Sequence, residues 1–214
     1  MRSRTVCGFF MLLLVLGLVP VSADSVIQRG IDVFTTPGDG KTFYDFAKSP
    51  IPAGFFCKGS KPFAGKVAFK GLPLATGSPD QLWGADTVIE RLDDAAFDEK
   101  GVAMTRLQFR ALSLVSLSPV KTSCGAYHVY VSLGGRQRIT EMSILRTQEG
   151  GGNFLAPLAV DVRMTFIPVK PGLGKAARKL ELAEGFTFPP SPLPWSFRDR
   201  AQAKGIGLVS VDTD

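Results

Sequence analysis

The sequence predicts an all-β fold, an antiparallel β-sandwich of about eight to ten strands. Short runs in which apolar and polar residues alternate follow one another along the chain, and glycine or proline separates them. The composition supplies many such separators, with 23 glycines and 15 prolines among 214 residues. A chain of this length buries roughly 70% of its unfolded surface, so a core can form without a stabilising metal.

The first 23 residues are interpreted as an export signal peptide and not as part of the fold. Arg2 and Arg4 form a positive start, residues 9–19 are apolar, and small residues precede a cleavage site between Ala23 and Asp24. An uncleaved membrane anchor is the competing interpretation, but the apolar run is shorter than the roughly 20 residues of a bilayer span. We therefore expect a secreted or periplasmic protein without a transmembrane segment in its mature chain.

Residues 24–214 are expected to form a single domain. The segment 189–214 begins with four prolines in six residues, so it is expected to pack more loosely than the rest. Residues 61–70 match residues 170–179 at six of ten positions, which leaves a degenerate internal duplication open as an alternative organisation.

The charge of the chain argues against a nucleic-acid partner. Loss of the leader removes two arginines and no acid, so the formal charge falls from +6 to +4. The remaining lysines and arginines are scattered, whereas a nucleic-acid binder would show a basic stripe or a recognisable module. The partner stays unknown, with an envelope glycan or protein as the open possibilities.

Cys57 and Cys124 are predicted to form a disulfide. Cys7 is lost with the leader, which leaves these two cysteines in an oxidising compartment where pairing is the normal outcome. The bridge would close a loop of about 68 residues, worth roughly 4 kcal/mol in the chain-entropy model.

The stretch from Val102 to Arg146 is expected to organise the fold. Its first half alternates but changes phase twice, which indicates a bulge or a strand that crosses from one sheet to another. The apolar positions are Leu107, Phe109 and Ala111, then Leu112 and Leu114, then Val115 and Leu117. Further on, Gly134-Gly135 predicts a two-residue hairpin whose register places His128 opposite Glu141.

His128 and Glu141 form a weak candidate polar pair. His128 is the only histidine, so a general base or a zinc ligand of imidazole type would have to be this residue. A zinc site lacks a second histidine or free cysteine, and a serine nucleophile lacks its elbow motif. We expect the pair to be sheet surface, and we assign no catalytic residue, no metal ligand and no cofactor.

Three other patterns in the sequence could support chemistry. Gly38-Asp39-Gly40-Lys41-Thr42 resembles the end of a phosphate-binding loop but lacks its first glycine and a following helix. Acids at 93, 94, 98 and 99 lack the spacing of a calcium loop and are expected to be solvated. A sugar-binding platform would draw on the aromatic residues Tyr44, Trp83, Tyr127, Tyr130 and Trp195.

The sequence therefore predicts an exported, non-enzymatic binding or interaction module of the bacterial envelope or extracellular space. A secreted hydrolase acting on a polysaccharide or an ester is one alternative, through carboxylates or His128. A structural component of a surface layer or appendage is another.

Overall fold

The computed structural model describes residues 26–74, 84–157, 159–170, 176–187, 192–197 and 208–211. The predicted fold class is confirmed, because the chain is all-β, about 60% strand and built of large antiparallel sheets consistent with a β-sandwich. No helix occurs in these ranges. They contain fifteen strands instead of the expected eight to ten, since several strands are only two to five residues long.

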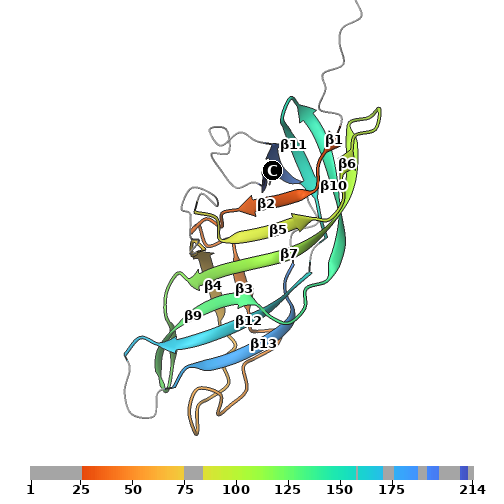
Figure 1. Cartoon of the computed structure of the whole chain (residues 1–214). Coiled ribbons are helices and arrows are strands. Elements are labelled where there is room, and N and C mark those ends of the chain that lie inside the picture. Colours follow the sequence, from red (N-terminus) through yellow and green to blue (C-terminus); the bar gives the residue numbers. More distant parts are fainter. Residues whose placement is uncertain are drawn as a thin grey trace, which may run out of the picture.

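One part of the molecule is a closed ring of strands, in the upper half of Figure 1. Each strand of the ring pairs with the next, and the pairing of β10 with β7 closes it. Every pairing is antiparallel except that of β14 with β15. The ring runs through β7 (Val102–Ser116), β10 (Ile139–Gln148), β11 (Gly151–Leu155), β14 (Leu193–Phe197), β15 (Leu208–Val211), β2 (Gly30–Phe34) and β5 (Thr87–Arg91).

The other part is a curved sheet that lies below the ring in Figure 1. Its strands pair in the order β3–β4–β7–β9–β12–β13, and β8 pairs with β9. A separate ribbon joins β1 (Val26–Ile27) to β6 (Ala95–Ala96). The strands of the curved sheet are β3 (Phe43–Asp45), β4 (Lys66–Gly71), β8 (Val120–Thr122), β9 (Gly125–Leu133), β12 (Ala159–Pro168) and β13 (Arg178–Thr187).

Strand β7 belongs to both parts, which confirms the predicted crossing strand. Its first half pairs with β5 and β10, and its last residues pair with β4 and β9. Val88 pairs with Ala111 but Ile89 pairs with Phe109, so β7 has one extra residue there and its side chains change face. The second predicted change of phase is wrong, because Leu114 and Ser116 stay buried while Leu117 is 40% exposed.

The predicted hairpin between β9 and β10 is wrong, although a glycine turn connects them. The two strands pair with different halves of β7, so they lie one after the other along it. His128 therefore lies opposite Ile167 of β12, and Glu141 lies opposite Arg106 of β7. The long strand β7 pairs with both β9 and β10, and these pairings replace the local hairpin.

The side chain of Gln137 holds this connection in place. Its Nε2 donates to the carbonyl oxygens of Gly134, at 2.5 Å, and of Asp161, at 2.9 Å. Its Oε1 accepts from the N–H of Asp161, at 3.2 Å. The buried amide thus takes the place of a neighbouring strand beside the start of β12.

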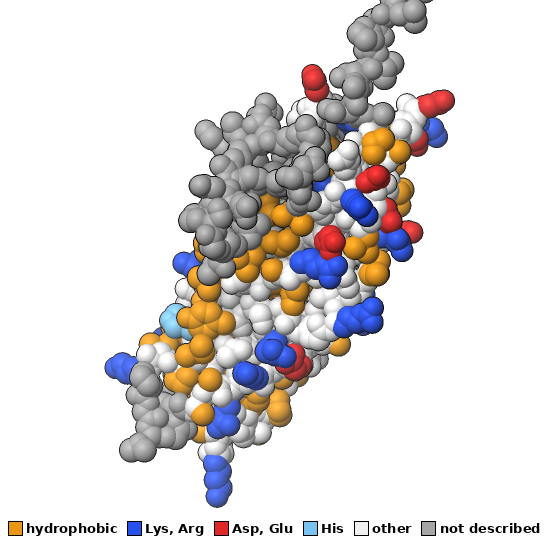
Figure 2. Space-filling view, in the orientation of Figure 1, with side chains coloured by type: hydrophobic (Ala, Val, Ile, Leu, Met, Phe, Trp, Pro, Cys, Tyr) orange, Lys and Arg blue, Asp and Glu red, His pale blue; other side chains and the backbone are white. Residues whose placement is uncertain are grey.

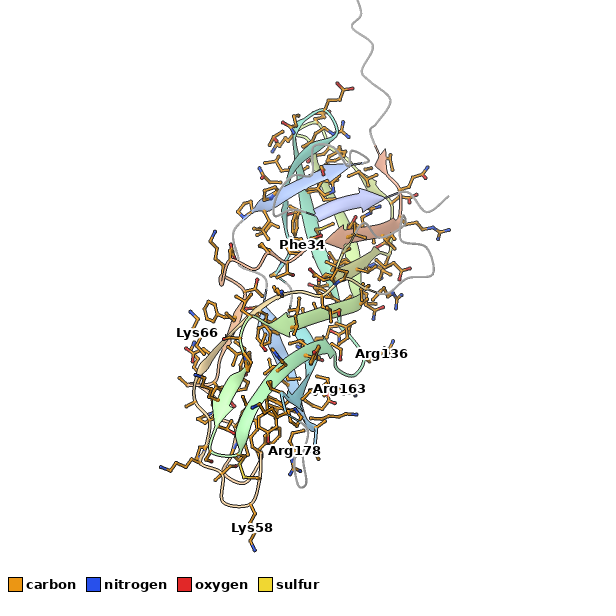
Figure 3. The ribbon with its side chains drawn as sticks, turned by 90° about the vertical axis from the view of Figure 1, so that its left-hand side faces the viewer. Phe34, Lys58, Lys66, Arg136, Arg163 and Arg178 are labelled. Atoms are coloured by element: carbon orange, nitrogen blue, oxygen red, sulfur yellow. A yellow bond between two sulfur atoms is a disulfide. The ribbon has the colours of Figure 1, made fainter. Side chains whose placement is uncertain are left out.

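Aromatic side chains fill the inside of the curved sheet. They come from strands on both sides of it and from residues 46–65, which fold back between them. Tyr44 packs against Phe186, which brings the first and last strands together. In Figure 3, Phe34 lies in the ring, and Lys58 marks this loop at the far end of the molecule. The aromatic set comprises Tyr44, Phe46, Phe55, Phe56, Phe63, Phe69, Tyr127, Phe166 and Phe186.

The predicted disulfide between Cys57 and Cys124 is present, with 6.0 Å between the two Cα atoms. It ties the aromatic loop to the turn between β8 and β9. Segment 189–214 contributes β14 and β15 to the ring, and Trp195 is only 4% exposed. The predicted leader and cleavage site lie outside the described residues, as does part of the proposed repeat, residues 171–175.

Candidate functional site

The outward surface of the curved sheet carries the strongest candidate site. Along β9, Tyr127, Val129 and Val131 are buried inside, so His128 and Tyr130 point outward. The same alternation turns the neighbouring outward side chains of β7, β8 and β12 onto this surface. We call this surface the β9 face, and it comprises Val115, Leu117, Lys121, Ala126, His128, Tyr130, Thr165, Ile167 and Val169.

The strand register fixes how these side chains lie. A single row crosses the sheet from β4 to β13 through Val115, Tyr130 and Thr165. His128 and Ile167 form the next pair, and Val169 follows beside Ala126, to whose carbonyl its N–H donates at 2.9 Å. Because β-pairing positions all of them, the face is built from rigid elements.

Three aliphatic side chains protrude from the β9 face. Leu117 is 40% exposed, and Ile167 and Val169 are each 42% exposed. Val115 and Tyr130 are half-buried between them. Single exposed aliphatics are common on proteins, but a contiguous group of this kind marks an interaction surface. In Figure 2, the histidine, in pale blue, lies at one margin beside hydrophobic side chains.

Exposed lysines surround the apolar centre. Lys121 lies opposite Ala126, and Lys170 directly follows Val169. Lys70 and Lys179 end the row that crosses the sheet through Tyr130. The adjacent row of the same surface contains Glu181, which is paired with Arg163. The electrostatic character of the face is therefore positive.

His128 belongs to this face and not to a catalytic pair. Its neighbour across the strands is Ile167, while Glu141 lies on β10 in the ring opposite Arg106. Nδ1 of His128 is buried, and no described residue hydrogen-bonds to it. The carboxylate that would orient the imidazole of a general base is thus displaced to the other part of the molecule.

A polar pocket of about 560 Å³ lies at the end of the ring, between the start of β2 and the end of β5. Arg91 and Asp32 form a salt bridge there with both side chains fully buried, and Arg91 Nε donates to the carbonyl of Gln28 at 3.2 Å. The backbone N–H of Arg29 donates to Asp94 Oδ1 at 2.7 Å. These charges hold β2 against β5. Arg91 is buried but lines the pocket, and its Nη2 has no hydrogen-bond partner among the described residues.

Asp86 is a buried acid at the boundary between the two parts. It accepts hydrogen bonds from the Thr36 N–H at 2.5 Å, Thr36 Oγ1 at 3.0 Å and Thr87 Oγ1 at 2.7 Å. Burial raises the pKa of its carboxyl, and these hydrogen bonds act in the opposite direction. A Cβ at Gly71 would overlap the carboxylate, so glycine lets β4 approach it. Asp86 therefore has a structural role, because it joins the backbone at Thr36 to the start of β5 beside β4.

The acidic residues at 93, 94 and 98 bind different partners and do not converge on one site. Asp93 binds Arg106 through two bonds, of 2.7 and 2.8 Å, and these hydrogen bonds lower the pKa of its carboxyl. Asp98 Oδ1 accepts from the backbone of Lys100 and Val102, as expected of a turn residue. In the part of the chain that the structure describes, no three histidine, cysteine, aspartate or glutamate side chains gather into a metal-binding group.

The aromatic platform weighed from the sequence does not form. Tyr44, Tyr127 and Trp195 pack inward, so Tyr130 is the only described member of the predicted platform that points outward. Trp83 lies outside the described residues. Sequence reasoning recognised the alternation of β9 but missed the face, because its protruding aliphatics lie on two segments that only pairing with β9 brings together.

Comparisons with known proteins leave the site to be interpreted from its own geometry. The chain matches no protein-family model, no curated protein and no solved structure. Within the described ranges, no helix has the length and hydropathy needed to cross a membrane.

Proposed function

We propose that the protein is an exported, non-enzymatic binding module that acts in the bacterial envelope or extracellular space. The observation that carries this proposal is the β9 face, where three exposed aliphatic side chains lie together within a border of lysines. A surface of this kind is costly to leave in water and is typical of an interaction site. The function is therefore binding through this surface.

Export is supported by two independent features. The N-terminal residues have the charge, apolar run and small residues of a signal peptide. The Cys57–Cys124 disulfide suits an oxidising compartment, since reducing conditions inside the cell oppose such bonds. The proposed binding module accordingly meets its partner outside the cytoplasm.

A retention experiment tests this function. The oxidised mature protein is mixed with separated membrane, peptidoglycan and secreted-glycan fractions, and the bound share is measured after sedimentation. We expect at least one fraction to retain it, and the double variant Ile167→Ser, Val169→Ser to be retained less.

The matched control removes equally exposed aliphatics elsewhere. Met104 and Ile139 are 53% and 50% exposed on strands β7 and β10 of the ring. The double variant Met104→Ser, Ile139→Ser should bind like the wild type. Failure of every fraction to retain the protein, or equal losses in both double variants, would reject the proposed function.

A further inference from the structure

We infer that the β9 face docks the protein onto the surface of an anionic phospholipid bilayer. This inference rests on the proposed function and names its partner. Three properties of the face lead to it, namely protruding aliphatic side chains, a border in which lysines outnumber acids, and positions set by paired strands.

The aliphatic side chains give the face a means of entering the bilayer interface. Leu117, Ile167 and Val169 extend outward from neighbouring segments, each with about two-fifths of its surface exposed. Peripheral proteins bind by burying such side chains at the boundary between headgroups and acyl chains, and their affinity grows with the apolar area buried. An acidic polysaccharide would leave these aliphatics in water, because sugars stack on aromatic rings. Tyr130 is half-buried, and the ring of Phe43, the outward aromatic beside Ala68, is already covered by Lys66.

The lysines determine the charge of the partner. Lys121 and Lys170 lie beside Ala126 and Val169, and Lys70 and Lys179 end the row through Tyr130. Lysine stems cover apolar surface while their ammonium groups reach outward, so they can contact headgroup phosphates around inserted aliphatics. Each lysine near an anionic membrane strengthens binding about fivefold.

The same charges argue against a second copy of this chain as the partner. An isologous contact would place the face against itself, and its lysines would then meet lysines. Glu181, in the next row of this surface, is already paired with Arg163 and does not neutralise these lysines. An anionic surface attracts these lysines, whereas a symmetric dimer would bring them close to one another and they would repel.

Vesicle sedimentation tests the inference directly. The oxidised mature protein is mixed with vesicles of phosphatidylcholine alone, or of phosphatidylcholine and phosphatidylglycerol in equal parts. We expect binding to the anionic vesicles only, and a large loss of binding when salt rises from about 0.1 M to about 1 M, where the screening length falls from about 10 Å to about 3 Å.

Paired charge variants locate the contact. The double variant Lys121→Gln, Lys170→Gln should bind the anionic vesicles on the order of 20-fold more weakly. The control Lys100→Gln, Arg136→Gln removes the same charge from the β6–β7 turn and the β9–β10 connection. In Figure 3, Arg136 lies at the opposite margin of the molecule from Lys66, the first residue of β4. This control should bind like the wild type, and thermal melting should show both variants folded.

The outcomes separate this inference from the proposed function. Retention by an envelope fraction without binding to anionic vesicles would overturn the bilayer as partner and leave the binding function standing. Equal binding to both vesicle types, or equal losses in the two charge variants, would overturn it as well. Concentration-dependent dimerisation abolished by Ile167→Ser, Val169→Ser would assign the face to a second copy instead.

Discussion

The ring and the curved sheet close their cores by different means. The ring closes through backbone hydrogen bonds, because β7 pairs with strands on both of its sides and the remaining strands lead back to it. The curved sheet has two ends, and aromatic side chains from a disulfide-held loop fill the space between them. A closed ring leaves no edge to protect, whereas an open sheet needs a covering segment and a means of holding it.

The two cores also differ in chemistry. The ring encloses the Asp32–Arg91 ion pair among apolar side chains such as Ile89 and Ile144, and the curved sheet is filled mainly by phenylalanine and tyrosine. The apolar side chains of both parts form one continuous cluster. A buried ion pair is costly to break but adds little net stability over apolar residues. Packed aromatic rings stabilise mainly through the apolar area that they bury. The ring should therefore be sensitive to loss of one charge, and the curved sheet to release of its loop.

Breaking the ion pair should give the largest effect. Asp32→Ala leaves the buried guanidinium of Arg91 without its carboxylate, and we expect a loss of about 3–5 kcal/mol in the free energy of unfolding. Urea denaturation of the oxidised protein measures it. The double variant Asp32→Leu, Arg91→Met should recover most of the loss, and a single variant as stable as the wild type would contradict this account.

Removing the disulfide should have the next largest effect. The double variant Cys57→Ser, Cys124→Ser should lose about 2–4 kcal/mol, since the unfolded chain is no longer constrained. Hydrogen exchange should show protection lost first in residues 46–65 and at the β8–β9 turn, and kept in β5 and in the first half of β7. Earlier loss of protection in the ring would contradict the conclusion that the disulfide mainly stabilises the curved sheet.

Asp86 should make the free energy of unfolding depend on pH, with an effect smaller than those of the two changes above. Burial raises the pKa of its carboxyl in the folded protein. The folded state then keeps a proton that the unfolded state releases above about pH 3.9, so stability falls as pH rises through the raised folded pKa.

The variant Asp86→Asn provides the reference for this pH effect. Its unfolding free energy, subtracted from that of the wild type, removes the contributions of other acids such as Asp93. The free energy of unfolding of the wild type, relative to that of Asp86→Asn, should decrease as the pH rises from about 3 to neutrality. A difference that is constant or that changes in the opposite direction would contradict the assignment.

The sequence was sufficient for the properties that depend on local pattern. Alternation in β9 and β12 predicted which side chains are buried, and the phase change in β7 predicted the crossing between the two parts. The pairing of Cys57 with Cys124 was also predicted from the sequence, and the structure contains this disulfide. A period of two residues is a local property, so it can be read without knowledge of the partner strand.

The choice of partner strand was decided only by the tertiary structure. Gly134-Gly135 predicted a hairpin, but β9 and β10 instead pair one after the other along the same edge of β7, so His128 and Glu141 do not pair. The same pairing brought Leu117, His128, Ile167 and Val169 from three segments onto the β9 face. The sequence alone determined which residues face outward, and long-range pairing decided which of them lie together, because a strand edge is supplied by residues far away in the chain.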